Sequence, residues 1–259
     1  MVATWQEDEM DLQLHGRTAL VTGASMGIGR GIALALAAEG VKLAVVARRQ
    51  ALLDELADEI VAAKGPRPAV IVADIMAADA ASSISQQVLG ALGHVDILIN
   101  NAGGSRKLLV DAPEASWEEA MTLNFTRVRQ ITHALLPAMM ARKWGRIVNI
   151  SGKSEPEGLN GAFAAKAAIH AWAKGLSREV GKFGITVNSI APGRIISEQI
   201  LRNYPPEERQ HLSDTEIPVG EYGQPADLAV LAVFLSSPVA RYITGTVIPV
   251  DGGLRRYQF

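Results

Sequence analysis

The residues of this chain that are best suited to chemistry lie between positions 151 and 170. Lys166 stands in an alanine-rich run, residues 162–166, with almost no other charge for a turn on either side. On a helix, its neighbours four residues before and after are Ala162 and His170. A charged group isolated in apolar surroundings favours a specific binding partner over plain solvation. His170 is more typical of a packed helix residue than of a catalytic base.

The segment in front of this helix is charged. It contains Lys153, Glu155 and Glu157, and serines stand at positions 151 and 154. Either glutamate can act as a general acid or base if burial raises its pKa, and the lysine can polarise an oxygen or bind a carboxylate. A solvated surface loop explains the same charges equally well.

Composition removes several classes of function. The 259 residues include no cysteine, which excludes disulfides, thiolate metal sites and a cysteine nucleophile. The histidines and acidic residues show no metal-ligand spacing, so we predict no metal site. A net charge of −2 gives no electrostatic case for nucleic acid or an anionic membrane, and no apolar stretch is long enough to span a bilayer. The acidic N-terminus lacks the features of a signal peptide, so we expect a cytoplasmic protein acting on a small molecule.

A glycine-rich stretch, residues 22–31, lies between a predicted strand and a predicted helix. Its glycines at positions 23, 27 and 29 follow the spacing Gly-x-x-x-Gly-x-Gly. Glycine lets the backbone approach a phosphate closely, and the N-terminus of the next helix offers free N–H groups and a partial positive charge. Glycine also serves tight turns, but the strand-before and helix-after context favours a pyrophosphate-binding loop.

Strand-like and helix-like segments alternate along the chain. Strands are predicted at residues 18–22, 42–47, 69–73, 95–100, 146–150, 186–190 and 247–250, and helices at 29–39, 51–63, 80–92, 117–141, 161–182 and 225–236. Most strands are continuous apolar runs, which is typical of parallel strands covered on both faces. The pattern predicts an α/β, three-layer, doubly wound parallel sheet, the Rossmann fold. We expect an N-terminal arm at 1–14, one domain at 15–259, and an irregular excursion above the sheet at 193–223.

Together these motifs resemble the short-chain dehydrogenase/reductase family, and among its members the 3-oxoacyl-ACP reductases. Besides the glycine-rich stretch, the resemblance rests on Asn100-Asn101-Ala102-Gly103 after the fourth strand, Asn124 on the next helix, Pro192-Gly193 after the sixth strand, and residues 242–245 with 250–253. The motifs stand in the family's order over about residues 14–254.

The resemblance implies a site for NADP(H), with NAD(H) as the alternative. Arg48 follows the second strand, where an acidic residue would favour NAD, and an arginine suits a 2′-phosphate; a solvated strand end is the plainer explanation. Asp74 corresponds to an adenine contact or else caps a helix. The implied cofactor-binding residues are Gly23, Ser25, Gly27, Ile28, Gly29, Arg48, Asp74, Asn101, Ala102, Gly103, Lys166, Pro192, Gly193, Ile195 and Ser197.

The same resemblance shows a gap in the catalytic residues. The family carries Tyr-x-x-x-Lys, whose tyrosine is the general acid/base, but the position four before Lys166 is Ala162. The implied catalytic residues are Asn124 in a proton relay, Ser151 (or the serine at 154) on the substrate oxygen, and Lys166 on the nicotinamide ribose. A loop carboxylate, water, Tyr204 or Tyr222 can replace the missing hydroxyl.

Three functions are compatible with these observations. The retained Asn124 and Lys166 favour an NADP(H)-dependent oxidoreductase acting on a carbonyl/alcohol pair. The charged loop favours a non-redox enzyme on the same scaffold, such as a lyase, hydrolase or isomerase. A nucleotide-binding protein with little catalysis is the third. The resemblance also implies pairing through the helices at 117–141 and 161–182, so we expect a homotetramer or, failing that, a dimer.

Overall fold

The apolar runs of the sequence form one sheet of seven parallel strands. The computed structural model describes residues 11–152 and 158–256. The strands are β1 (Thr18–Thr22), β2 (Lys42–Ala47), β3 (Ala69–Val72), β4 (Ile97–Asn100), β5 (Gly145–Ile150), β6 (Ile185–Pro192) and β7 (Val247–Val250). Their order is β3-β2-β1-β4-β5-β6-β7, and every neighbouring pair is parallel. The predicted α/β Rossmann fold is therefore confirmed.

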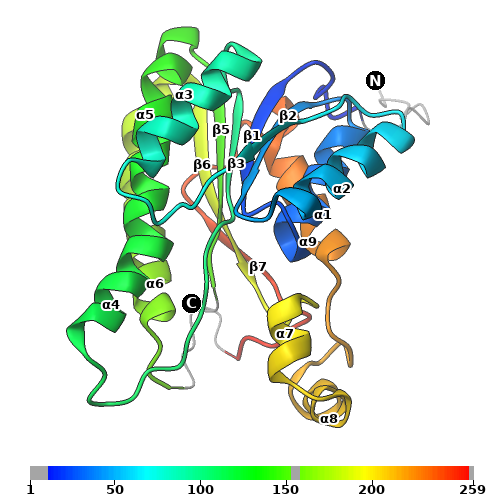
Figure 1. Cartoon of the computed structure of the whole chain (residues 1–259), viewed down its shortest axis with the longest axis vertical. Coiled ribbons are helices and arrows are strands. Elements are labelled where there is room, and N and C mark those ends of the chain that lie inside the picture. Colours follow the sequence, from blue (N-terminus) through cyan, green and yellow to red (C-terminus); the bar gives the residue numbers. More distant parts are fainter. Residues whose placement is uncertain (1–10, 153–157, 257–259) are drawn as a thin grey trace, which may run out of the picture.

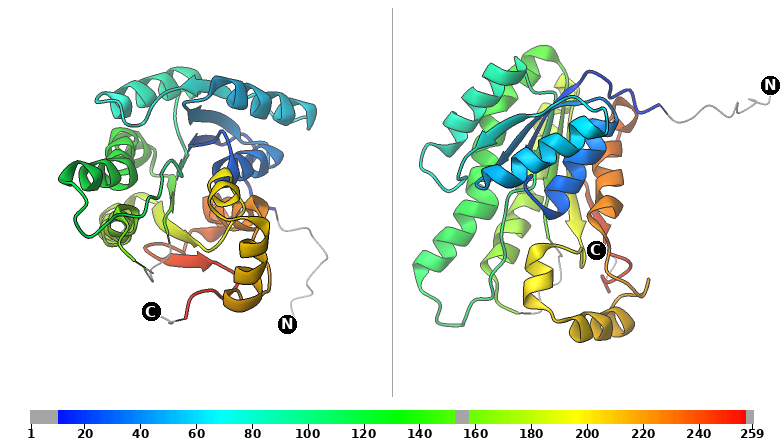
Figure 2. Two further views of the ribbon diagram at one scale, coloured as in Figure 1. Left: turned by 60° about the horizontal axis from the view of Figure 1, so that its bottom comes forward. Right: turned by 45° about the vertical axis from the view of Figure 1, so that its right-hand side comes forward.

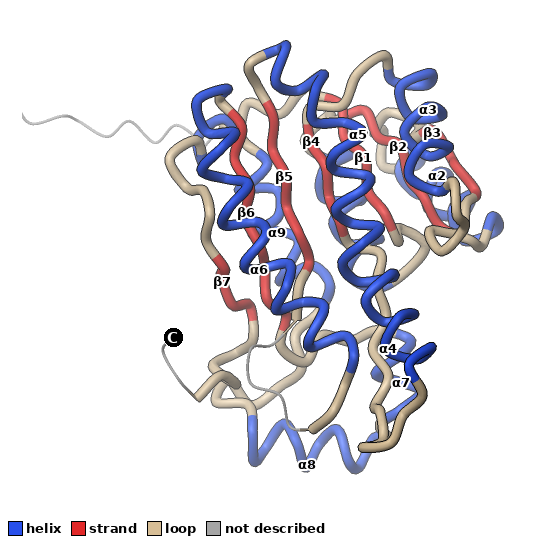
Figure 3. Tube along the Cα trace, turned by 90° about the vertical axis from the view of Figure 1, so that its left-hand side faces the viewer, coloured by secondary structure: helices blue, strands red, loops and turns tan. Residues whose placement is uncertain are grey.

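Helices cover both faces of the sheet. On one face lie α1 (Gly27–Ala38), α2 (Gln50–Ala62) and α9 (Pro225–Ser236); on the other lie α3 (Ala80–Leu92), α4 (Glu114–Met121), α5 (Arg127–Arg142) and α6 (Gly161–Val180) (Figures 1 and 3). The remaining helical segments are η1 (Thr122–Thr126), η2 (Gly181–Phe183), α7 (Glu198–Asn203), α8 (Pro206–Glu216) and η3 (Pro238–Ala240). These three layers follow from the right-handed connections between parallel strands.

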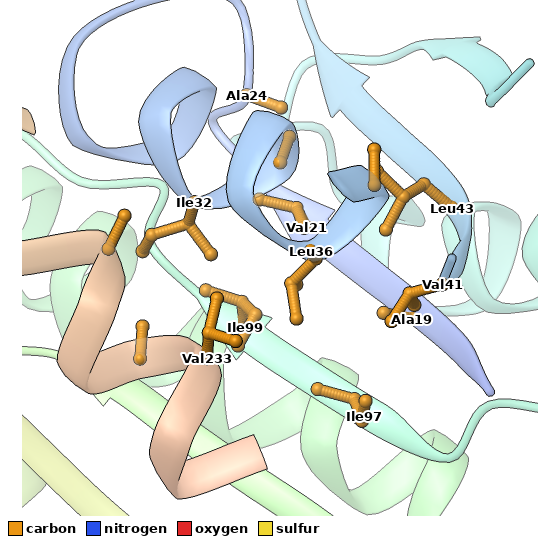
Figure 4. Packing of buried hydrophobic residues seen from close by; sticks show 14 of the residues in the cluster. Ala19, Val21, Ala24, Ile32, Leu36, Val41, Leu43, Ile97, Ile99 and Val233 are labelled. Carbon is orange, nitrogen blue, oxygen red and sulfur yellow. The ribbon is translucent and has the colours of Figure 1, made fainter. Parts of the chain in front are cut away.

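Two apolar clusters hold the layers together. Because side chains alternate along a strand, Ala19 and Val21 of β1 enter the cluster beneath α1 (Figure 4). Leu20, between them, enters the cluster on the opposite face. All five residues of β1 and all six of β5 are buried. Burying one such aliphatic side chain stabilises the fold by about 1.5–3 kcal/mol, so the central strands form a rigid floor for the loops that follow them.

Two parts of the chain differ from the sequence-based expectation. The helix predicted at 117–141 is interrupted by η1, a π-helical turn. The excursion predicted as irregular contains α7 and α8. α8 begins with Pro206 and carries Glu207 and Glu208 in its first turn, which are helix-start signals. Its residues are mostly polar and exposed, so it lacks the apolar periodicity from which helices are predicted.

The carboxyl ends of the strands share one edge of the molecule. α4, α7 and α8 extend beyond this edge, which faces the viewer in the left panel of Figure 2. Ligands of doubly wound sheets bind at this edge, where the strand order reverses between β1 and β4. At the other end of the chain, Leu14 of the predicted arm is buried in the cluster beneath α1. Among the described residues, no helix combines the length and apolarity needed to cross a bilayer.

Candidate functional site

The glycine-rich loop after β1 is packed tightly against the loop after β4. Gly23 has a φ of +67°, and a Cβ atom there would lie 2.9 Å from both the Cα of Ala102 and the Nδ2 of Asn101. A Cβ on Gly29 would collide with the Gly23 carbonyl and with the Asn101 amide. Two of the predicted glycines are therefore required by close backbone approach, which explains their spacing.

Thr22 and Asn101 hold these two loops together. The Thr22 hydroxyl donates to the Ile99 carbonyl (3.2 Å) and accepts the backbone N–H groups of Asn101 (3.0 Å) and Ala102 (3.1 Å). In return, Nδ2 of Asn101 donates to the carbonyls of Thr22 and Gly23, both at 3.0 Å. The Asn101 side chain thus organises the loop from inside, and its predicted role at a cofactor is an indirect one.

The N-terminus of α1 has no side-chain cap. Its N-cap residue, Met26, makes no side-chain hydrogen bond to the first turn. Ser25, Gly27 and Ile28 around it are half-buried. A Cβ on Gly27 would lie 3.4 Å from the Cβ of Ser197, so the start of α7 adjoins the loop. The glycine cradle and the free N–H groups fit the pyrophosphate of a dinucleotide.

At the end of β2, the predicted Arg48 is accompanied by a second arginine that contacts the site. Arg48 is exposed, as a 2′-phosphate ligand should be. Arg49, which we did not single out, contacts the site through Glu198 at 3.2 Å and through the sulfur of Met26 at 2.9 Å. Asp74 accepts the backbone N–H of Met76 at 2.9 Å. It does not cap a helix, because α3 begins six residues later, so that alternative was wrong.

The turn after β6 brings the excursion to the same edge. Pro192 ends β6, and a Cβ on Gly193 would lie 2.6 Å from the Cβ of Asp251, so the turn has no room for a side chain. Ile195 is buried and pairs with Gly223 in a short parallel bridge. Ser197 caps α7 by accepting the N–H of Ile200 at 3.3 Å. Since a Cβ on Gly27 would lie 3.4 Å from the Cβ of Ser197, Ser197 lies beside the glycine loop.

Asn124 lies in the π-helical turn η1 and is fully engaged with the backbone. Its Oδ1 accepts the Gly104 N–H at 3.1 Å, and its Nδ2 donates to the carbonyls of Gly104 and Ala120, both at 3.0 Å. A π turn re-aims a helical side chain, and such turns are frequent at functional sites. Here the turn fixes the loop after β4 to the neighbouring helix.

Lys166 reaches the same place from α6. Its Nζ donates to the Ile150 carbonyl at 2.6 Å, at the end of β5. A Cβ added to Gly103 would lie 2.8 Å from Asn124 Oδ1 and 3.3 Å from Lys166 Nζ, so Asn124 and Lys166 converge on that glycine. Burial lowers the pKa of Lys166 to about 8. The lysine is therefore no solvated surface residue, and the structure brings Asn124, Gly103 and Lys166 together.

The Ser151 hydroxyl is bonded within the protein. Its side chain is buried, with the whole residue 6% exposed. Its hydroxyl donates to the Ile190 carbonyl at 3.1 Å and lies 2.8 Å from Nε2 of His170. These contacts engage the hydroxyl within the protein, and the role predicted for Ser151 on a substrate oxygen stays a prediction. The alternative serine at 154, with Lys153, Glu155 and Glu157, lies outside the described residues.

Ala162, which stands where the family has its tyrosine, lies where α6 packs through small residues against α4. Ala162 is 5% exposed, in the first turn of α6. A Cβ on its neighbour Gly161 would meet the Cβ of Ala120 at 2.5 Å. The backbone of α6 therefore lies very close to α4 at this point, which restricts any side chain on that side.

The tyrosines of the excursion gather around Arg194. Arg194 pairs with Glu216 at 2.8 Å, and its guanidinium lies 5.4 Å from the ring centroid of Tyr204. Tyr222 is buried, and burial raises its pKa. A hydroxyl with a raised pKa is a weaker acid, so Tyr222 is a poorer candidate for the proton donor than the sequence suggested.

Three polar residues near the site were not predicted. Asn160 caps α6 by accepting the Ala162 N–H at 3.0 Å and donates to the Ser105 hydroxyl at 2.7 Å. Gln199 on α7 donates to the Ser105 carbonyl at 3.1 Å. An asparagine just before a helix is a capping signal, so Asn160 was detectable; Ser105 and Gln199 stand in irregular sequence that carried none. Within the described residues, no group of three or more His, Cys, Asp or Glu side chains is arranged to hold a metal ion.

Sequence comparison finds reductases and dehydrogenases among the proteins similar to this chain. A family model described as "Enoyl-(Acyl carrier protein) reductase" matches residues 23–255. The chain is 35% identical to the 3-oxoacyl-[acyl-carrier-protein] reductase FabG of Pseudomonas aeruginosa, over 94% of this chain and 99% of the relative. It is 37% identical to a galactitol 2-dehydrogenase (L-tagatose-forming) of Cereibacter sphaeroides, over 93% and 96%.

Solved structures give the same result. A 7α-hydroxysteroid dehydrogenase complexed with NADH and 7-oxo glycochenodeoxycholic acid superposes with a TM-score of 0.90 at 31% identity, covering 95% of this chain and 97% of that one. The RhlG/NADP active-site complex of Pseudomonas aeruginosa superposes with a TM-score of 0.86 at 34% identity, covering 95% and 99%. On these matches and on the converging Asn124 and Lys166, the chain belongs to the short-chain dehydrogenase/reductase family.

Proposed function

We propose that this protein is a dinucleotide-dependent oxidoreductase that interconverts a carbonyl and an alcohol, with NADP(H) preferred over NAD(H). The observation that carries the proposal is the convergence of Asn124 and Lys166 on Gly103, beside the glycine cradle. A protein that bound only the adenine half of a nucleotide would have no need for a half-buried lysine there. The relatives' names, which are those of reductases and dehydrogenases, support the same chemistry.

Each part of the proposed site has a separate task. The cradle of Gly23, Gly27 and Gly29 with the N-terminus of α1 holds the pyrophosphate, and Arg48 the 2′-phosphate. Lys166 holds the nicotinamide ribose. The bound nucleotide supplies hydride chemistry, which the protein itself cannot provide. The preference for NADP(H) rests on the arginines at the β2 end and on the absence of an acidic residue there.

The proposed site lacks the tyrosine hydroxyl with which the family transfers a proton to the substrate oxygen. Ala162 has no hydroxyl, and the hydroxyl of Ser151 is already bonded within the protein. Loss of a general acid typically slows a reaction about 10²–10⁴-fold without abolishing it. We assign the proton to water or to a carboxylate of the Glu155–Glu157 segment, and we expect a slow enzyme or one adapted to a substrate that needs little acid assistance.

The second candidate is a non-redox enzyme, or a nucleotide-binding protein with little catalysis, on the same scaffold. The specific observation in its favour is that position 162 carries no hydroxyl and that the Ser151 hydroxyl is bonded within the protein. We also propose a single domain over residues 15–259, a homotetramer and a cytoplasmic location, in keeping with the family resemblance.

The deciding experiment follows deuterium. NADPH deuterated at the reactive C4 position is incubated with protein and with the carbonyl classes named for the relatives: a 3-oxoacyl thioester, a ketohexose and a 7-oxo bile acid. The proposal expects deuterium in an alcohol product, carried on the former carbonyl carbon. Bound NADPH that keeps its deuterium with every class, or a product formed without oxidation of NADPH, would transfer support to the second candidate.

A further inference from the structure

Helix α6 is attached to the end of β5 at two successive residues. Lys166 donates from Nζ to the carbonyl of Ile150 at 2.6 Å. One helical turn later, Nε2 of His170 lies 2.8 Å from the hydroxyl of Ser151. Side chains four residues apart lie on the same helix face, so the two contacts form one clip between α6 and the strand. The clip is defined here as Lys166, His170, Ile150 and Ser151.

Ser151 fixes the strand side of the clip. Its backbone N–H donates to the carbonyl of Ile190 at 2.8 Å, and its hydroxyl donates to the same carbonyl at 3.1 Å. When the single hydroxyl proton points to Ile190 of β6, the Ser151 oxygen accepts from His170 in the tautomer that carries its proton on Nε2; in the other tautomer the hydroxyl donates to His170 instead.

The surroundings of His170 keep the ring neutral. Its pKa is lowered by burial first, and then by the positive charges of Lys166 on the same helix and Arg255 in the C-terminal segment. Ser151, the residue that follows β5, contacts the ring. A protonated ring would add a third positive charge between these two cations, so the neutral form is the one compatible with a charged Lys166.

We propose that His170 is a positioning residue for Lys166, which acts through Ser151 to hold the end of β5 where the lysine can reach its carbonyl. Removing the His170–Ser151 contact frees the strand end to move away from α6. Lys166 then loses its fixed partner, gains access to water, and no longer projects beside Gly103 in one position. The consequence for nucleotide binding rests on the proposed function; the effect on the lysine itself does not.

The test measures the pKa of Lys166 directly, by ¹³C NMR of reductively methylated lysines, with the signal assigned from its loss in Lys166→Arg. His170→Leu removes the contact but retains apolar volume, Ser151→Ala removes the other partner, and His170→Gln keeps an N–H donor. We expect the Lys166 pKa to rise from about 8 toward its ordinary value in His170→Leu and in Ser151→Ala. In His170→Gln it should stay near the wild-type value.

The double variant His170→Leu with Ser151→Ala separates coupling from packing. If the two residues act through one contact, the double variant shifts the Lys166 pKa no further than either single variant. NADPH affinity should fall about two- to tenfold in the same variants, as for the loss of one hydrogen bond. A lower melting temperature with an unchanged Lys166 pKa would assign His170 and Ser151 a purely structural role and overturn the inference.

The two proposals fail in different ways. If the Lys166 pKa moves as expected but neither NADPH nor NADH binds the wild-type protein, the clip stands and the proposed function fails. If NADPH binds and Lys166→Ala weakens it, while the Lys166 pKa is the same in wild type, His170→Leu and Ser151→Ala, the clip fails and the proposed function stands.

Discussion

Arg49 at the end of β2 is paired with Glu198, the first residue of α7, at 3.2 Å across the edge where the glycine loop lies. The same guanidinium lies 2.9 Å from the sulfur of Met26 at the N-cap of α1. Residues 149 positions apart therefore meet over the site proposed for the nucleotide. The pair joins the start of α7 to the nucleotide side of the crevice.

Replacing Glu198 should strengthen binding of the phosphorylated nucleotide. In Glu198→Gln, Arg49 is released from its partner and a negative charge leaves the neighbourhood of the phosphates. Exposed ion pairs contribute about 0.2–1 kcal/mol, so we expect NADPH affinity to rise about one-and-a-half- to fivefold with little change for NADH, measured by fluorescence titration. Glu207→Gln on α8, which neutralises another exposed acid, is the matched control. Weaker NADPH binding in Glu198→Gln would show that the pair supports the bound state.

An alanine at Gly29 should disrupt the nucleotide cradle. The added Cβ would collide with the Gly23 carbonyl and the Asn101 amide, so the loops after β1 and β4 must separate. We expect a lower melting temperature and loss of measurable NADPH binding in Gly29→Ala. The control is Gly90→Ala in α3, where a Cβ meets open space and the exchange should stabilise the helix by about 0.5–1 kcal/mol. Normal NADPH binding in Gly29→Ala would contradict the account of the cradle.

The affinity for nucleotide should depend on pH through Lys166. Burial lowers its pKa to about 8, so the ammonium loses its proton as the pH rises through that value. Because the charged form is favoured by the ribose hydroxyls and nearby phosphates, NADPH affinity should decline between pH 7 and pH 9. Isothermal titration across this range checks it. The decline should be absent in Lys166→Ala, and the same decline in that variant would assign it to another group.

Lys166 should also make the free energy of unfolding depend on pH, and this quantity should rise with pH whereas the nucleotide affinity falls. A lysine whose pKa is lowered on folding binds more protons in the unfolded chain, so the unfavourable burial of its charge is relieved as pH rises. We expect the stability of the wild type, relative to Lys166→Met, to increase from about pH 8 toward the ordinary lysine pKa of about 10.5. Urea unfolding at a series of pH values measures this difference, and a flat difference would place the lysine in water.

Restoring the hydroxyl tests the missing proton donor. Ala162→Tyr places a phenol four residues before Lys166, and Ala162→Phe adds the same ring without it. If proton transfer limits the reaction, kcat/KM for carbonyl reduction should be about 10²–10⁴-fold higher with tyrosine than with phenylalanine. The close approach of Gly161 to Ala120 means that both variants must first be shown to fold. Equal rates in two folded variants would mean that another group already supplies the proton.

The sheet was predictable because each strand is an uninterrupted apolar run of the kind that parallel strands need. The glycines at 23 and 29 were also predictable, since close backbone approach leaves no choice of residue. α8 was missed because a polar surface helix carries no apolar stripe to detect.

Other features depend on contacts that sequence order does not reveal. The direction of the Ser151 side chain is set by the pairing of β5 with β6, which gives its hydroxyl the Ile190 carbonyl as a partner. The pairing of Arg49 with Glu198 depends on how the excursion folds back over β2. For the same reason, spacing along the chain pointed to Arg48 and not to the Arg49 contacts with Glu198 and Met26.

The central claim is tested most directly by titrating the wild-type protein with NADPH and with NADH, alongside Arg48→Ala, Lys166→Ala and Lys174→Ala. Lys174 is an exposed lysine on the same helix and serves as the matched control. The account predicts saturable binding of NADPH, tighter than that of NADH, weakened in Arg48→Ala and Lys166→Ala and unchanged in Lys174→Ala. Failure of the wild type to bind either nucleotide would contradict it.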